Sequence, residues 1–166
     1  MRAGTVDLAL TAPQPREPRA RALRWRRLLT EPLGLAVPPD HRLAGRKRVQ
    51  LAELADEPFV VLRSGMGLRT IVEEACRTAG FTPRIAFEGD EVATLRGLIG
   101  AGLGVSLLPA HHTEEPRRGE RAHLISVVAP VCTREIGLAW LADRLLPPAA
   151  RAFRDHVLRT RPPRAP

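Results

Sequence analysis

The sequence contains no tyrosine, and phenylalanine and tryptophan bring its aromatic content to only 4%. Proteins that bind nucleic acid by base stacking interleave aromatic side chains with basic ones. This chain is basic, with 26 lysines and arginines against 18 acidic residues and a net charge of +8. The basicity invites a nucleic-acid function, but the shortage of aromatic residues argues against recognition by stacking.

Cysteines and long apolar runs are also scarce. Cys76 and Cys132 form no CxxC pair, which favours reduced thiols over a disulfide framework. Cys76 falls on the apolar stripe of a predicted helix, so a buried small hydrophobe is favoured over a reactive thiol. No apolar run approaches the roughly 20 residues that span a bilayer, and residues 1–14 make a poor signal peptide. We therefore expect a cytoplasmic protein with no membrane partner.

The positive charge is concentrated at the two ends of the chain. Residues 1–30 carry a net charge of +5 and residues 111–166 a net charge of +4, whereas residues 31–110 carry −1. All the basic residues except Lys47 are arginine, and alanine, glycine and proline are also abundant, which is typical of GC-rich coding. The well-patterned middle of the chain therefore lacks the basic stripe of a nucleic-acid-binding element.

The hydrophobic pattern alternates between strands and helices. The clearest helix spans 66–79, with Ser64 as a candidate cap and Gly80 as its left-handed end. Asp90 is the expected cap of a second helix, a short turn precedes Pro58, and a third helix covers 147–158. The pattern predicts strands at 5–11, 22–30, 33–37, 59–62, 84–88, 103–109, 124–129 and 135–141. This order predicts an α/β domain with a mostly parallel sheet, whose ligands lie at the carboxyl ends of strands.

Motifs for catalysis and metal binding are missing. Neither Ser64 nor Ser106 lies in a GxSxG elbow, there is no Walker A pattern, and the glycine-rich stretches do not complete a dinucleotide fingerprint. His111 and His112 could hold a metal together with His123, but adjacent histidines in a polar loop are more often solvated. We therefore expect no enzyme, no cofactor and no metal.

Two joints between a strand and a helix favour ligand binding. After the strand at 59–62, the free N–H groups of the following helix, an arginine and a serine hydroxyl suit an anion, above all a carboxylate. A plain cap at Ser64 with a surface Arg63 is an equally good interpretation, and at the second joint a plain cap at Asp90 is favoured. The candidate effector-binding residues are Arg63, Ser64, Gly65, Met66, Gly67, Glu88, Gly89 and Asp90.

Several motifs, in this order and at these spacings, resemble a known family. They are DLAL near the start, a strand followed by PxDHxLA, and then LAELADEPFV, CRTAGFTP and LIGAGLGVSLLP. Together they are similar to the effector-binding domain of LysR-type transcriptional regulators, most clearly from Thr5 to Pro109. Arg42 departs from the family, which usually has proline after the histidine, and should loosen that turn without altering the fold.

The resemblance implies a two-lobed, type II periplasmic-binding-protein-like α/β fold with mixed, mostly parallel sheets and an incomplete first lobe. A small effector, expected to be a carboxylate or another anion, would bias a DNA-bound oligomer between two arrangements. The second lobe would offer the joints at 63–67 and 88–90 to the effector. The expected division is 1–40 in the first lobe, 41–123 in the second lobe, 124–160 as return strands and C-terminal helix, and 161–166 as a frayed tail.

Relative to the family, this sequence lacks the winged helix-turn-helix, so DNA would be reached only through a domain absent from this chain. It also lacks the first strand and helix of the first lobe, which normally form part of the effector cleft and of the dimer contact. We therefore interpret the chain as a fragment of a sensing domain. Its effector affinity should be weak or lost, and the strand at 5–10 should form an uncovered, association-prone sheet edge.

Two other functions stay open at this point. One is a solute-binding protein or an enzyme on the same fold, although no acid/base pair, nucleophile or export signal supports it. The other is an arginine-rich nucleic-acid binder using residues 16–27. Leu23, Trp25, Leu28 and Leu29 in that stretch instead favour a strand or core position. A salt titration separates these cases, because phosphate contacts weaken steeply with salt.

Overall fold

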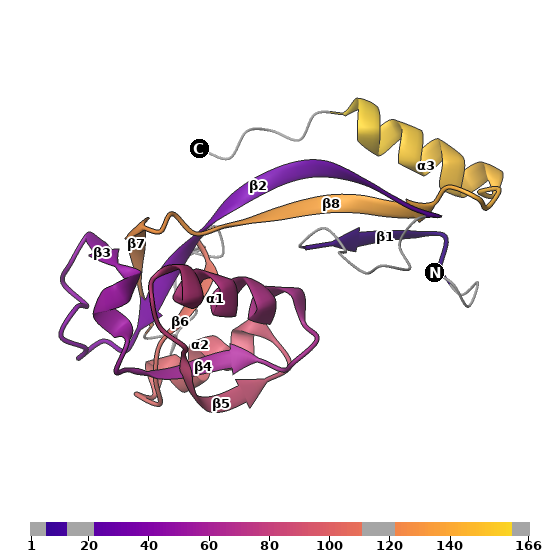
Figure 1. Cartoon of the computed structure of the whole chain (residues 1–166). Helices are drawn as coiled ribbons and strands as arrows, with labels where there is room; N and C mark the ends of the chain where they lie inside the picture. Colours follow the sequence, from indigo (N-terminus) through magenta and orange to yellow (C-terminus); the bar gives the residue numbers. More distant parts are fainter. Residues whose placement is uncertain (1–5, 13–21, 111–121, 161–166) are drawn as a thin grey trace. The chain divides into compact units, whose positions relative to one another are not determined.

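The computed structural model describes residues 6–12, 22–110 and 122–160, and the chain divides into two compact units. Unit 1 comprises residues 1–31 and 134–166, and unit 2 comprises residues 32–133. These units reflect packing within this chain, so the lobe bounds expected above remain a prediction. In chain order the elements are β1 (Leu8–Thr11), β2 (Leu23–Val37), β3 (Arg48–Gln50), the 3-10 helix η2 (Leu51–Leu54), β4 (Pro58–Leu62), α1 (Gly67–Thr78), β5 (Arg84–Gly89), α2 (Val92–Gly100), β6 (Ser106–Pro109), β7 (His123–Ala129), β8 (Thr133–Leu141) and α3 (Pro148–Arg159) (Figure 1).

The long strand β2 differs from the two separate runs that the sequence predicted. It continues through Pro32, which lies at the border between the two units. Proline lacks a backbone N–H and is tolerated in a strand only where no ladder bond is needed. From Leu33 onward β2 pairs with β6, and the Leu33 N–H donates to the Cys132 carbonyl at 2.9 Å. β2 is therefore one continuous strand, and Pro32 lies directly before the residues that pair with β6 and β7.

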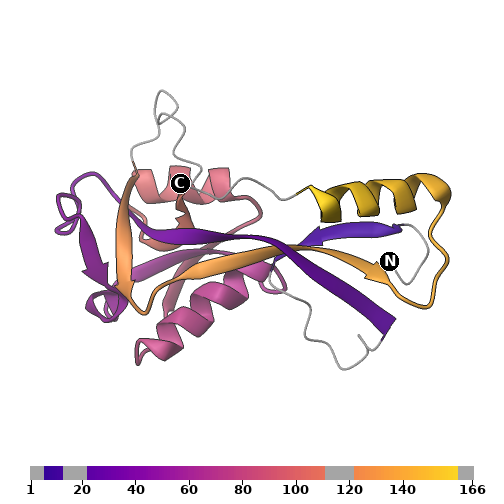
Figure 2. The same cartoon turned by 90° about the horizontal axis from the view of Figure 1, so that it is seen from above.

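The described strands of unit 2 belong to two sheets: β4 and β5 form a two-stranded sheet, and β2, β3, β6 and β7 belong to a mixed sheet. β4 and β5 pair in parallel and are connected by α1, as the predicted strand–helix–strand unit requires. Val105, just before β6, bridges Phe59 in parallel, while β2 pairs antiparallel with β6 and with β7. These pairings of β2 with β6 and β7 add more antiparallel pairing than the sequence predicted, since it indicated a mostly parallel sheet. Helices α1 and α2 both pack on β4, and Figure 2 shows them on opposite sides of this strand.

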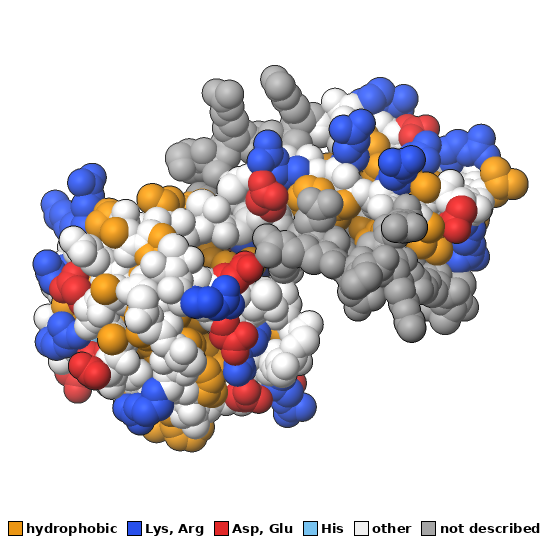
Figure 3. Space-filling model, viewed as in Figure 1, with side chains coloured by type: hydrophobic (Ala, Val, Ile, Leu, Met, Phe, Trp, Pro, Cys, Tyr) orange, Lys and Arg blue, Asp and Glu red, His pale blue; other side chains and the backbone are white. Residues whose placement is uncertain are grey.

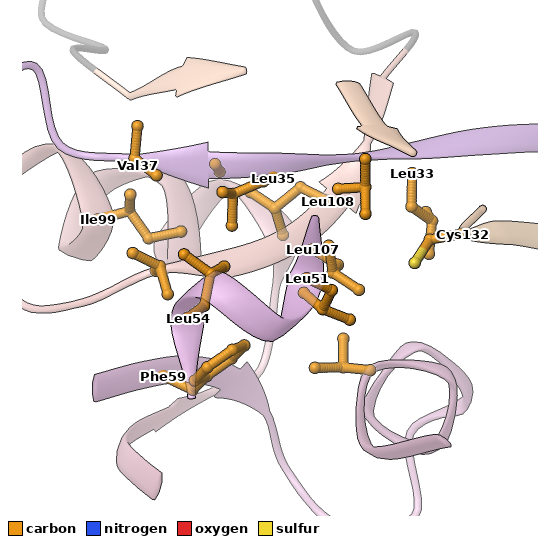
Figure 4. Packing of buried hydrophobic residues seen from close by; sticks show 14 of the residues in the cluster. Leu33, Leu35, Val37, Leu51, Leu54, Phe59, Ile99, Leu107, Leu108 and Cys132 are labelled. Atoms are coloured by element: carbon orange, nitrogen blue, oxygen red, sulfur yellow. The ribbon is translucent and has the colours of Figure 1, made fainter. Parts of the chain in front are cut away.

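The hydrophobic core of unit 2 explains this layering. β4 is a continuous apolar run, and β6 is apolar after Ser106 and buried throughout, which is typical of strands covered on both faces. Figure 4 shows side chains of β2, β6 and α2 meeting those of η2 and β4. The largest fully buried members are Phe59, Leu35, Leu51, Leu54, Leu95, Ile99, Leu107 and Leu108.

The turn that follows β2 is held by side chains. The Leu43 N–H donates to His41 Nδ1 at 3.2 Å, and His41 Nε2 lies 3.2 Å from Glu57. Arg42 donates to the Glu53 carbonyl at 2.6 Å and pairs with Glu57 at 3.2 Å. The loosening that we expected from Arg42 is therefore offset by new bonds to the segment that leads into β4.

In unit 1, β1 pairs antiparallel with β8, and β8 neighbours β2. The Trp25 indole N–H donates to the Thr11 hydroxyl at 3.0 Å, and Arg154 of α3 lies over the Trp140 ring at 5.6 Å. β1 is the end strand of its sheet within the described residues, and Leu10 is 66% exposed. The predicted uncovered edge is present in that part of the chain.

Candidate functional site

The two predicted joints lie at one edge of the sheet in unit 2. Because β4 and β5 run in parallel, with Leu62 opposite Gly89, their carboxyl ends meet there. The Arg63 N–H donates to the Gly89 carbonyl at 3.0 Å, and Arg63 Nε lies 2.9 Å from Asp90 Oδ1. The structure thus joins the segments 63–67 and 88–90, which are distant in the sequence.

The start of α1 differs from the predicted Ser64 cap. Gly65 has φ +88°, and the Met66 N–H donates back to the Arg63 carbonyl at 3.2 Å. This left-handed turn delays the helix, so Met66 is the N-cap and Ser64 lies two residues before it. No side chain caps α1, and no acidic residue lies in its first turn. The positive end of the helix dipole is therefore not neutralised by a side chain.

Asp90 was also predicted to be a cap, and this is wrong. The N-cap of α2 is Glu91, without a side-chain cap bond, while the Asp90 carboxylate pairs with Arg63. Both side chains of this pair are 65% exposed. An exposed ion pair of this kind contributes only about 0–1 kcal/mol, so a ligand anion can replace Asp90 beside Arg63 at low cost.

Arg69 was not among the predicted site residues, yet it ties the two strand ends together. Its guanidinium donates to the Leu62 carbonyl at 3.0 Å, to Glu88 at 2.7 Å and to Glu73 at 2.6 Å. Burial of this side chain disfavours its charge, but the bonds to Glu88 and Glu73 outweigh that effect and raise the pKa of Arg69. The i, i+4 pair with Glu73 was the only signal in the sequence, and such pairs are common on helix surfaces.

The two cysteines are free and buried, as expected. Burial, with a smaller contribution from neighbouring Cys132 and Glu73, raises the pKa of the Cys76 thiol from 9.0 to about 12. Burial raises the pKa of Cys132 from 9.0 to about 11. Because the thiolate is the reacting form, these values favour structural thiols over reactive ones.

We expect neither thiol to react with 5,5′-dithiobis(2-nitrobenzoic acid) at pH 8 while the chain is folded, whereas the urea-unfolded chain should release two equivalents. Since the pKa of each thiol is raised by folding, its contribution to stability is complete below pH 9 and is lost as the pH rises toward 11 to 12. Unfolding midpoints measured from pH 8 to pH 11 should therefore fall. Rapid modification of either thiol in the folded chain would contradict the assignment.

The described residues contain no group of three or more His, Cys, Asp or Glu side chains that could hold a metal ion. Two of the histidines considered as ligands, His111 and His112, lie outside the described residues. Within the described part, no helix is long and apolar enough to cross a membrane.

The arginine-rich stretch forms part of a strand from Leu23 onward. Leu23, Trp25, Leu28 and Leu29 are half-buried in β2, and Arg27 pairs with Glu135 of β8 at 2.7 Å. Arg16 to Arg21 lie outside the described residues. On the face of unit 2 that Figure 3 shows, basic and acidic side chains are interspersed. This mixture does not favour a phosphate-binding surface.

Comparison with known proteins finds relatives that match nearly the whole chain. The uncharacterized HTH-type transcriptional regulator YybE of Bacillus subtilis is 38% identical over 159 residues, which are 95% of this chain and 52% of the relative. The dual regulator GltC of the same organism is 34% identical over 155 residues, 92% of this chain and 50% of GltC. The chain thus spans about half the length of these relatives.

Solved structures agree with the fold. The effector-binding domain of QuiR in complex with shikimate superposes with a TM-score of 0.84 at 25% identity, over 95% of this chain and 73% of that one. The C-terminal domain of a LysR family regulator from Rhodococcus sp. RHA1 gives 0.79 at 28% identity, over 95% and 76%. The predicted type II periplasmic-binding-protein-like fold is thereby confirmed. Residues 1–162 match the LysR substrate binding domain family, so this chain belongs to that family.

Proposed function

We propose that this chain is the effector-sensing part of a LysR-type transcription regulator and binds a small anion, most simply a carboxylate. The proposed site is the strand-end edge of unit 2, at residues 63–67 and 88–90. The observation that carries this proposal is the start of α1, which has no side-chain cap and lies beside Arg63. Backbone N–H groups at a helix start, together with an arginine, form a ready site for an anion.

Binding would exchange one partner of Arg63 for another. The ligand carboxylate takes the place of Asp90 at the guanidinium, and the N–H groups that begin α1 donate to its second oxygen. Arg69 acts as a positioning residue, because it holds the ends of β4 and β5 at a constant separation through Leu62 and Glu88. We infer binding and not catalysis, because these ionisable side chains are already paired with one another and offer no base beside a nucleophile.

In the whole regulator, the ligand would act by preferring one of two arrangements of an oligomer on DNA. DNA contact would be made by a reading domain and not by this unit. We place the protein in the cytoplasm, where a regulator meets the chromosome.

The test is a two-dimensional NMR titration of the labelled chain with shikimate and a panel of small mono- and dicarboxylates. We expect the amides of residues 63–69 and 89–91 to shift with one or more of these ligands. Arg63→Ala should weaken that binding about tenfold, because a charge-assisted bond is worth roughly 1.5–3 kcal/mol.

Arg84→Ala is the matched control. Arg84 begins β5, at the end of the strand opposite the site, and its guanidinium contacts only the Asp56 carbonyl, at 3.4 Å, within the described residues. The Arg84→Ala variant should bind the carboxylates with the same affinity as the unmodified chain. Shifts confined to residues far from the edge, or equal losses in both variants, would contradict the proposed site.

A further inference from the structure

We propose that Arg96 of α2 is a second, buried binding residue for the same anion. This inference rests on the function proposed above and adds a residue that no motif indicates. Arg96 is only 9% exposed. It follows Val92 by four positions and Leu95 by one, so it occupies the buried face of α2 together with Leu95 and Ile99. An arginine at such a position replaces a core residue and requires an explanation.

Arg96 differs from the other poorly exposed arginines in its partners. Arg69, with a side chain that is 12% exposed, pairs with two carboxylates, and Arg134, at 18%, pairs with Glu31. Among the described residues, no carboxylate lies within ion-pair distance of Arg96. Its guanidinium donates to one acceptor there, the Pro109 carbonyl at 3.3 Å. A guanidinium carries five N–H donors, so most of its bonding capacity is unused.

The position of Arg96 brings it to the edge where β4 and β5 end. The Phe59–Val105 bridge is parallel, so β6 runs in the direction of β4, and Pro109 is its last residue. The Pro109 carbonyl therefore lies at the carboxyl end of β6. α2 begins directly after Asp90 and Glu91, and four residues of helix advance by about 6 Å. The bond to Pro109 thus holds the guanidinium of Arg96 near the start of α2.

A buried charge without a counter-ion destabilises the folded chain, whereas a ligand carboxylate beside it would supply the missing partner. The same desolvation makes the resulting ion pair stronger than one at the surface. Arg63 would be the exposed and exchangeable contact, and Arg96 the contact that makes an uncharged ligand unfavourable.

The first experiment compares urea unfolding of the unmodified chain, Arg96→Met and Arg96→Lys in chloride buffer without carboxylates. Exposed Arg48 of β3, changed to methionine, is the control for loss of one positive charge. We expect Arg96→Met to be at least as stable as the unmodified chain, because an unpaired buried charge is removed at similar volume. A clear loss of stability in Arg96→Met that Arg96→Lys does not show would overturn the proposal, since the charge would then be balanced within the chain.

The second experiment titrates the same variants with shikimate and malonate, and follows the side-chain Nε–Hε signal of Arg96. We expect this signal to shift when ligand binds, and Arg96→Met to weaken binding about tenfold or more while Arg48→Met does not. If Arg63→Ala weakens binding and Arg96→Met does not, the role of Arg96 is refuted and the proposed function stands. If the unmodified chain binds none of the carboxylates at this edge, the proposed function fails. The unfolding comparison still decides whether the charge of Arg96 is balanced by a partner within the chain.

Discussion

Gly104→Ala is expected to destabilise the chain by about 3 kcal/mol or more. Gly104 has φ +150°, and a Cβ atom there would lie 2.4 Å from the Pro58 carbonyl oxygen. That oxygen accepts the N–H of Val105 at 2.8 Å, and the Val60 N–H donates to the Val105 carbonyl at 2.9 Å. The substitution combines backbone strain of roughly 1–3 kcal/mol with loss of these two bonds, at about 1 kcal/mol each. Urea unfolding and thermal unfolding would measure the effect.

Gly97→Ala is the matched control. Gly97 lies in α2, and a Cβ atom there would have no neighbour within 4 Å. Alanine should leave stability unchanged or raise it by up to about 1 kcal/mol, because it is the better helix former. For a chain of this size, 3 kcal/mol corresponds to a fall in midpoint of about 6–12 °C. If the thermal midpoint of Gly104→Ala lies within about 1 °C of that of the unmodified chain, β4 and the segment before β6 do not approach each other as closely as described.

Glu31→Ala should cost about 3–5 kcal/mol. Glu31 of β2 lies 3.1 Å from Arg134 of β8, and their side chains are only 10% and 18% exposed. Arg134 Nε has no hydrogen-bond partner among the described residues, so Glu31 is the acidic partner there that balances its charge. Removing one partner of a buried pair leaves the other charge unpaired in a poorly solvated place. Chemical denaturation of the variant is the measurement.

The same two strands provide an internal comparison. Arg27 and Glu135 also join β2 to β8, but their side chains are 60% and 42% exposed. Glu135→Ala should therefore cost less than about 1 kcal/mol. In the double variant Glu31→Ala with Arg134→Met, much of the lost stability should return, because the unpaired charge is gone. Equal effects of Glu31→Ala and Glu135→Ala would show that burial does not govern these pairs.

Helices and strands were largely predictable from periodicity, but their starts were not. The stripe over 66–79 identified α1 because apolar residues at helical spacing leave few alternatives. Ser64 and Asp90 were assigned as caps from residue type alone. The structure instead uses Gly65 to delay α1 and Arg63 to engage Asp90. A cap depends on the path of the chain into the helix, which local composition does not specify.

The candidate site was likewise predictable only in part. The order strand–helix–strand indicated that the ends of the strands at 59–62 and 84–88 would lie together, because parallel pairing places carboxyl ends at one edge. No periodicity predicts that Arg69 reaches both strand ends. The sequence gives little sign of Arg96, because a charged residue beside leucines in a helix normally faces solvent, although its spacing from Val92 places it on the buried face.

By itself, the sequence determined the class of fold, the family resemblance and the segments at which an anion is expected to bind. The low aromatic content and the nearly neutral middle of the chain also argue against nucleic-acid binding. Only the tertiary structure decided which charges are paired. Glu31 with Arg134, Arg69 with Glu88 and Arg63 with Asp90 are each separated by at least 19 residues in the chain. Such pairs form because strand pairing brings distant residues within a few ångströms, where Coulomb energy and burial, not sequence distance, set their strength.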